Sequence, residues 1–115
     1  MTAYPGQLSP ISALQRLTLT GLTAAGSFAL QPNAVLVDII VSNTTANAIT
    51  GGLKFGTTAG GVDIMAALAV GANAIAPCVL LLRAFSRTAA QTIFFDTVTS
   101  WNSANVTIDV FYYQL

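Results

Sequence analysis

The stretch AVLVDIIVSN, residues 34–43, decides the predicted fold class. Every residue on one predicted face is β-branched: Val35, Val37, Ile39 and Val41. The other predicted face is half apolar and holds Leu36, Asp38, Ile40 and Ser42. A period of two indicates a β-strand, because successive strand side chains point to opposite sides. The stretch therefore predicts a strand that lies against a core.

Three further stretches repeat this alternation: LQRLTLTG (14–21), QTIFFDTVTSW (91–101) and ANVTIDVFYY (104–113). Segments rich in Gly, Asn, Ser and Thr, such as QPNA, VGANA and SWNSAN, separate the apolar stretches. Such turn signals recur about every ten residues, the spacing of a sandwich or barrel. We therefore predict an all-β protein, an antiparallel β-sandwich with a jelly-roll-like arrangement of strands.

Two stretches lack the alternation. VDIMAALAV (62–70) has the composition of a short helix, so we expect one or two helical turns there, with Asp63 as the N-terminal cap. PCVLLLRAFS (77–86) is continuously apolar, which is typical of a strand covered on both faces.

Residues 1–12 differ from the rest of the chain. Pro5, Gly6 and Pro10 interrupt regular strand pairing, so this segment is predicted to be an extended N-terminal arm. Residues 13–115 are then the single β-sandwich domain. Isolated apolar residues in the arm are candidate contacts for a partner: Tyr4, Leu8 and Ile11.

The chain has unusually few charges. Charged residues make up 7% of its 115 residues, where about 25% is usual. Four Lys and Arg residues balance four Asp residues, and the chain has no His. Four dispersed cations cannot form the basic patch that nucleic-acid binding needs. With 54% hydrophobic residues, a monomer would have little charge to prevent association. We therefore expect a homo-oligomer and no nucleic-acid partner.

The high mean hydropathy, +0.70, does not predict a membrane protein. The most apolar region is interrupted by Asp63, Asn73 and Pro77, which leaves no apolar run of about 18 residues. The first ten residues, MTAYPGQLSP, lack the basic start and apolar stretch of a signal peptide. We expect a protein made in the cytoplasm, with no membrane partner.

The stretch GGLKFGTTAGG, residues 51–61, contains five glycines and raises the question of phosphate binding. Gly51 and Gly56 have the spacing of a phosphate-binding loop, but Thr57 stands where that loop needs a lysine. No long helix is predicted to follow it. The sequence instead predicts two turns, ITGG and TTAGG, on either side of the short strand LKF.

No catalytic, metal or cofactor site is predicted. Ser–His and zinc–His arrangements need a histidine, which the chain lacks. Asp38, Asp96 and Asp109 are expected to be solubilising or to pair across strands with Arg16, Arg83 or Arg87. A calcium site at Asp63 is a weak alternative with a single carboxylate. Cys78 is predicted to be a small buried hydrophobic residue.

Aromatic side chains near the C-terminus are further candidates for an interface: Trp101, Tyr112 and Tyr113. Aromatic residues bury a large area at a small entropic cost, and they are enriched at protein interfaces. Ordinary packing in the core or at its rim is the alternative for the same residues.

From Asp38 to the C-terminus, the sequence resembles small structural proteins of tailed bacteriophages. The likeness lies in NTTANA, KFGTTAGG, VGANA and the ending that runs from TAAQT through Trp101 to NVTIDV. These relatives are β-sandwich proteins that decorate, or cement, the capsid or form the base of head fibres. The shared features are turn and strand patterns, so no functional residue is carried over.

The resemblance implies a homotrimer on the outer surface of an icosahedral head, binding the major capsid protein and stabilising contacts between its subunits. A tail-fibre or receptor-binding module of the same virion is an alternative. A small carbohydrate-binding domain with Trp101 and Tyr113 as stacking platforms is another. All three functions are non-enzymatic.

Overall fold

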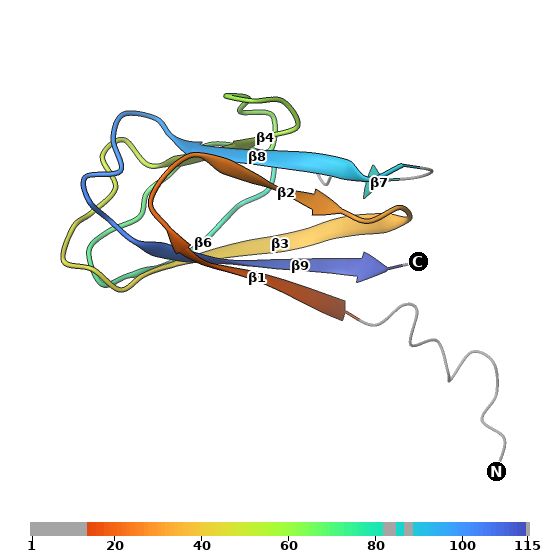
Figure 1. Cartoon of the computed structure of the whole chain (residues 1–115), viewed down its shortest axis with the longest axis horizontal. Coiled ribbons are helices and arrows are strands. Elements are labelled where there is room, and N and C mark those ends of the chain that lie inside the picture. The colour runs from red at the N-terminus through yellow and green to blue at the C-terminus, as the bar shows by residue number, and fades with distance from the viewer. Residues whose placement is uncertain (1–13, 82–84, 87–88, 115) are drawn as a thin grey trace, which may run out of the picture.

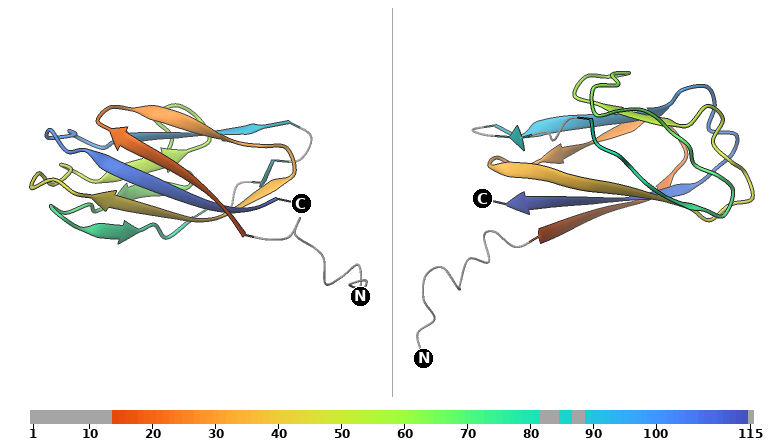
Figure 2. Two further views of the ribbon diagram at one scale, coloured as in Figure 1. Left: turned by 60° about the horizontal axis from the view of Figure 1, so that its bottom comes forward. Right: turned by 180° about the vertical axis from the view of Figure 1, so that it is seen from behind.

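The computed structural model describes residues 14–81, 85–86 and 89–114. These form nine strands: β1 (Leu14–Leu22), β2 (Gly26–Leu30), β3 (Ala34–Asn43), β4 (Leu53–Gly56), β5 (Met65–Leu68), β6 (Ile75–Pro77), β7 (Phe85–Ser86), β8 (Gln91–Thr97) and β9 (Val106–Gln114). Two sheets pack face to face (Figures 1 and 2), which confirms the predicted antiparallel β-sandwich. The predicted arm lies outside the described residues.

The strand order is that of a jelly roll. One sheet has the order β1-β9-β3-β6, with β7 also paired to β3, and the other has the order β2-β8-β4-β5. With β7 set aside, the first strand pairs with the last, the second with the second-to-last, and β3 and β4 with β6 and β5. All of these pairs are antiparallel. The chain is therefore one long hairpin folded over, the jelly-roll arrangement.

The core lies between the inner faces of the two sheets. Val106, Ile108 and Val110 of β9 are fully buried, as the alternation of that strand predicts. Ile93 and Phe95 face them from β8, and the Phe95 ring lies 6.5 Å from that of Phe55 in β4. The alternating stretches thus supply the core from both layers.

A β-bulge in β3 overturns the face assignment made from its sequence. The buried residues of this strand are Ala34, Leu36, Ile39, Val41 and Asn43. The register with β9 shifts between Leu36 and Asp38, so one extra residue turns the second half of the strand over. Val35 and Val37 consequently lie on the outer face and are only half buried.

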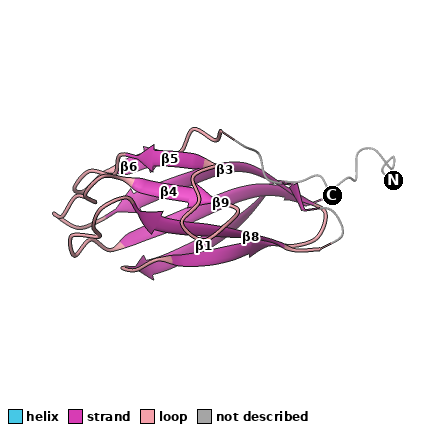
Figure 3. Cartoon of the chain, turned by 90° about the horizontal axis from the view of Figure 1, so that it is seen from above, coloured by secondary structure: helices cyan, strands magenta, loops and turns pink. Residues whose placement is uncertain are grey.

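The predicted helix at 62–70 is wrong, because this segment forms β5 and pairs with β4. The described residues are strands, turns and loops only (Figure 3), and they include no helix long and apolar enough to cross a membrane. Pairing with β4 supplies hydrogen bonds that a helix of two turns could not match, since short helices are marginal alone.

The stretch PCVLLLRAFS is not one strand covered on both faces. Its first residue, Pro77, ends β6, and β7 is a two-residue strand at its end. Between them, Val79 and Leu81 are 73% and 68% exposed. A continuously apolar run therefore does not mark a central strand here.

Candidate interaction surfaces

The glycine-rich segment turns the chain on both sides of β4, as predicted. Gly51 and Gly52 have φ angles of 80° and 87°, and Gly60 has a φ of 74°. Glycine adopts this left-handed region without the steric cost that other residues meet. The amide of Gly61 donates to the carbonyl of Thr58 at 2.9 Å and closes the second turn.

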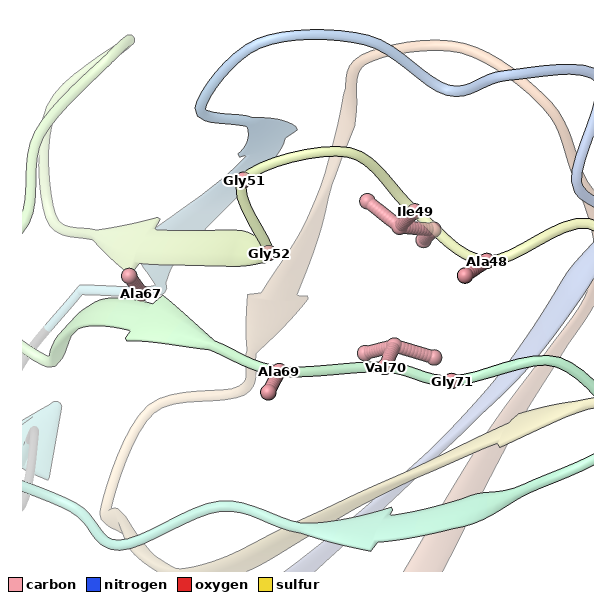
Figure 4. Close-up of a pocket in the computed structure, with 8 residues that line it drawn as sticks. All are labelled: Ala48, Ile49, Gly51, Gly52, Ala67, Ala69, Val70 and Gly71. Carbon is pink, nitrogen blue, oxygen red and sulfur yellow. The ribbon is translucent and has the colours of Figure 1, made fainter.

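A cavity of about 400 Å³ lies beside this segment, between the loop before β4 and the chain around β5. It is lined by Ala48, Ile49, Gly51, Gly52, Ala67, Ala69, Val70 and Gly71 (Figure 4). None of these lining residues has a polar side chain. A ligand site needs a few polar groups to orient its ligand, so this cavity offers only backbone groups and aliphatic contact.

A smaller cavity of about 300 Å³ lies on the outer face of the β2-β8-β4-β5 sheet and includes Ser27, Phe94 and Asp96. One carboxylate oxygen of Asp96 accepts a hydrogen bond from the amide of Thr97 at 2.7 Å. Lys54 of β4 stands directly opposite Asp96 in the register. Opposite charges at paired positions offset each other, so Asp96 does face a cation across strands, although this cation is Lys54 and none of the predicted arginines.

Asp109 pairs across strands, but with a threonine. Its carboxylate accepts a hydrogen bond of 2.6 Å from the Thr18 hydroxyl, and Thr18 is its partner in the β1–β9 register. Arg83 and Arg87, two of the predicted partners, lie outside the described residues. Asp38 accepts from the amide of Ile39 at 2.8 Å, next to the β3 bulge.

Asp63 fixes the second glycine turn and caps no helix. Its carboxylate accepts hydrogen bonds from both the hydroxyl and the amide of Thr57. These donors, the hydroxyl first, lower the pKa of Asp63 below its usual 3.8. Among the described residues no three His, Cys, Asp or Glu side chains gather into a group that could hold a metal ion.

Thr57→Val is expected to raise the pKa of Asp63 toward its usual value, because the variant keeps the amide donor but loses the hydroxyl. A lowered native pKa stabilises the fold above the unfolded-state pKa, and this contribution disappears as the pH falls through the native pKa. Carbon-13 NMR titration of the Asp63 carboxyl measures the shift, with Thr20→Val as the control. An unchanged titration would contradict the assigned hydrogen bond.

Cys78 is buried, as predicted, with 6% of its surface exposed. Burial, together with the negative charge of Asp38, raises the pKa of its thiol to about 11. The thiol therefore stays protonated near neutral pH and behaves as a small apolar residue.

The structure separates the candidate aromatic residues. Trp101 is half buried and meets the Phe95 ring edge-on at 6.5 Å, so it packs against the core. Tyr112 also packs against the core from the inner face of β9. Tyr113 is 42% exposed and lies beside Leu14 of β1. Tyr4, Leu8 and Ile11 lie outside the described residues.

Trp101 and Tyr113 do not form one stacking platform. Trp101 precedes β9, whereas Tyr113 lies near the far end of that strand. Seven residues at about 3.4 Å each separate Val106 from Tyr113, so the two rings lie at opposite ends of the sandwich. A single sugar ring cannot stack on both.

The most exposed apolar residues lie on a wall of the sandwich that sequence reasoning missed. From Ile75 to Leu81, outward and inward residues alternate, and the outward ones form what we call the apolar stripe: Ile75, Pro77, Val79 and Leu81. Ile75 is 72% exposed. A proline beside alternating aliphatic residues signals an edge strand, and this signal could have revealed the stripe.

Backbone hydrogen bonds hold the stripe in place across both sheets. The amide of Cys78 donates to the carbonyl of Ile39 in β3 at 2.8 Å. The amide of Leu81 donates to the carbonyl of Ile64, next to β5, at 2.7 Å. β5 and β6 accordingly lie along the same long side of the sandwich (Figure 3). The stripe is therefore an ordered surface that exposes only apolar side chains.

No protein-family model matches the chain, and no curated protein matches it. Among solved structures, the chain is similar to a chain from the capsid asymmetric unit of cyanophage Pam1. The identity is 18% and the TM-score 0.45, over 89% of this chain and 82% of the other. A similarity this low assigns no family to the chain.

Proposed function

We propose that this chain is a structural virion protein, a decoration or cement protein that binds the outer surface of an icosahedral phage head as a homotrimer. On this proposal it stabilises contacts between subunits of the major capsid protein and catalyses no reaction. The apolar stripe is the observation that carries the proposal, since an ordered aliphatic surface on a chain with 7% charged residues favours burial against protein.

The fold agrees with this proposal but does not single it out. Jelly rolls occur in viral capsid domains and also in lectins, and function has to be argued from surfaces. The larger cavity presents no polar side chain, and the aromatic rings proposed as a sugar platform lie at opposite ends of the sandwich. Protein contact is therefore favoured over carbohydrate binding.

The N-terminal arm is proposed to contact the capsid. β1 begins at Leu14, at the same end of the sandwich as the C-terminal end of β9 (Figure 1). Ten extended residues before this point reach roughly 33 Å, far enough to contact a neighbouring protein. Its apolar anchors would then be Tyr4, Leu8 and Ile11.

Light scattering behind size exclusion is expected to give three times the chain mass of 11.9 kDa.

The purified protein is also expected to bind capsid shells that lack it, in a co-sedimentation assay. Deletion of residues 2–12 should leave the trimer intact and weaken shell binding by at least tenfold. A soluble 11.9 kDa monomer at micromolar concentration would refute the trimer, and no binding to the shells would refute the decoration role.

A further inference from the structure

We propose that the copies associate head to tail, with the apolar stripe of one copy packed against the β1 edge of the next. This inference rests on the homotrimer of the proposed function and names the surfaces that build it. The β1 edge is the side of β1 that pairs with no strand of the described residues, together with Leu14 and the adjacent Tyr113.

Symmetry requires two different surfaces on each copy. A ring of three identical chains is built from heterologous contacts, in which one patch meets a different patch on the neighbour. A patch that binds its own copy instead gives a two-fold dimer. A stripe that does not lie along the three-fold axis therefore needs a second, complementary surface on the neighbouring copy.

The structure places such a surface at the opposite edge of the same sheet. In the order β1-β9-β3-β6, the stripe begins on β6 at one edge, and β1 is the other edge. Contacts that join opposite edges leave both surfaces of every copy occupied when the ring closes. Three copies in a ring thus cover both apolar edges at once.

The stripe side supplies aliphatic contact without charge. Its outward residues are three aliphatic side chains and a proline, while Ala76 and Cys78 between them are buried in the same chain. Pro77 has no amide hydrogen to donate toward a neighbour. Side-chain packing, and not added strand hydrogen bonds, is therefore the contact that this surface offers.

The β1 side is incompletely covered in the single chain. β1 is an edge strand of nine residues, whereas the other edge strands of the described residues, β2, β5, β6 and β7, have five, four, three and two. Long edges usually carry protection against association. The inward residues Leu17 and Leu19 are only half buried, although their β9 partners Val110 and Ile108 are fully buried.

The outer face at the start of β1 also offers apolar side chains, with Arg16 as the next residue on that face. Leu14 is 51% exposed and Tyr113 is 42% exposed, and they are direct partners in the β1–β9 register. Direct partners in an antiparallel pair share one face of the sheet. Val35 of β3 is the partner of Tyr113 on its other side. Aliphatic residues of a second copy would find matching apolar contact here.

Two single-surface variants test this pairing: Val79→Asp in the stripe and Leu14→Asp at the β1 edge. Each variant alone is expected to give the mass of a monomer in light scattering. Mixed in equal amounts, they retain one intact stripe and one intact β1 edge, so they are expected to form a heterodimer of twice 11.9 kDa. Val98→Asp is the matched control, since Val98 is 48% exposed outside both surfaces and should leave the trimer unchanged.

Circular dichroism and a melting curve confirm that each variant folds, and Val79→Ser and Leu14→Ser repeat the test with milder changes. The head-to-tail pairing is refuted if either surface variant stays trimeric, or if the mixture stays monomeric. A parent protein that is not a trimer refutes the proposed oligomer itself, and capsid binding is measured separately. Failure of the pairing is thus distinguishable from failure of the proposed function.

Discussion

Gly56→Ala is expected to lower the free energy of unfolding by about 3 kcal/mol, the upper end of the range for inserting an atom into a packed site. A Cβ at this position would lie 2.4 Å from the carbonyl carbon of Gly61 and 2.6 Å from its oxygen. Neither the backbone around Gly56 nor that of Gly61 can move away easily. The carbonyl of Phe55 accepts from the amide of Ile64, and the amide of Gly61 is held by Thr58.

Alanine variants at two other glycines distinguish the cost of steric crowding from the cost of backbone strain. At Gly71 an added Cβ would meet only Ala74 at 3.6 Å, so Gly71→Ala should change stability by no more than about 0.5 kcal/mol. Gly60 has a φ of 74° and open space, so Gly60→Ala should cost about 1 kcal/mol through strain alone. Urea unfolding at one fixed protein concentration measures all three. Equal stability of the Gly56 and Gly71 variants would contradict the close approach.

The alternating stretches predicted most of the sandwich, because alternation reports directly on a half-buried sheet. In β9 and β8 one of the two alternating sets is buried, as alternation predicts: Val106, Ile108 and Val110 in β9, and Ile93, Phe95 and Thr97 in β8. The sequence predicted the turns equally well. Asn33, Asn73 and Asn102 have positive φ angles at three of the predicted turns, a conformation that asparagine tolerates better than most residues.

The predictions of local structure are wrong where contacts between residues distant in sequence decide that structure. The bulge in β3 depends on its register with β9, and no local pattern specifies that register. The segment at β5 is a strand because β4 lies beside it, although its Ala and Met composition favours a helix. The crowded contact between Gly56 and Gly61 likewise appears only when the turn closes.

The interaction surfaces were less predictable than the core. Aromatic residue type alone makes Trp101 a candidate for an interface, yet its ring packs edge-on against Phe95 in the core. The sequence does not reveal the apolar stripe, because a continuous aliphatic run predicts a strand that is covered on both faces. Its exposure follows from the chain crossing between the two sheets at their edge, where only the inward side finds partners. Composition cannot reveal which side a crossing segment leaves open.

The buried Asn43 side chain reinforces the backbone hydrogen bonds that join two loops of the sandwich, such as that from the amide of Asn73 to the carbonyl of Thr45. Asn43 is 2% exposed at the end of β3. Its Nδ2 donates to the carbonyls of Asn47 and Gly71 at 2.8 and 3.0 Å. Its Oδ1 accepts from the amide and the hydroxyl of Thr45 at 3.0 and 2.7 Å. The side chain therefore ties the loop after β3 to the loop before β6, with all of its hydrogen-bonding groups occupied.

Asn43→Ala is expected to cost about 3 kcal/mol, because it leaves buried donors and acceptors of both loops without partners. Asn43→Asp keeps the size but replaces the donor amide with an oxygen that faces the carbonyls of Asn47 and Gly71. It should be at least as destabilising at pH 7 and partly recover in acid, where protonation restores one donor. Asn102→Ala removes one exposed bond, to the carbonyl of Ala48, and places alanine at a φ of 51°, so it should cost about 1.5 kcal/mol from the lost bond and the backbone strain together. Urea unfolding at pH 7 and pH 4 measures each variant, and an Asn43→Ala protein as stable as Asn102→Ala would show that the two loops are held together by other contacts.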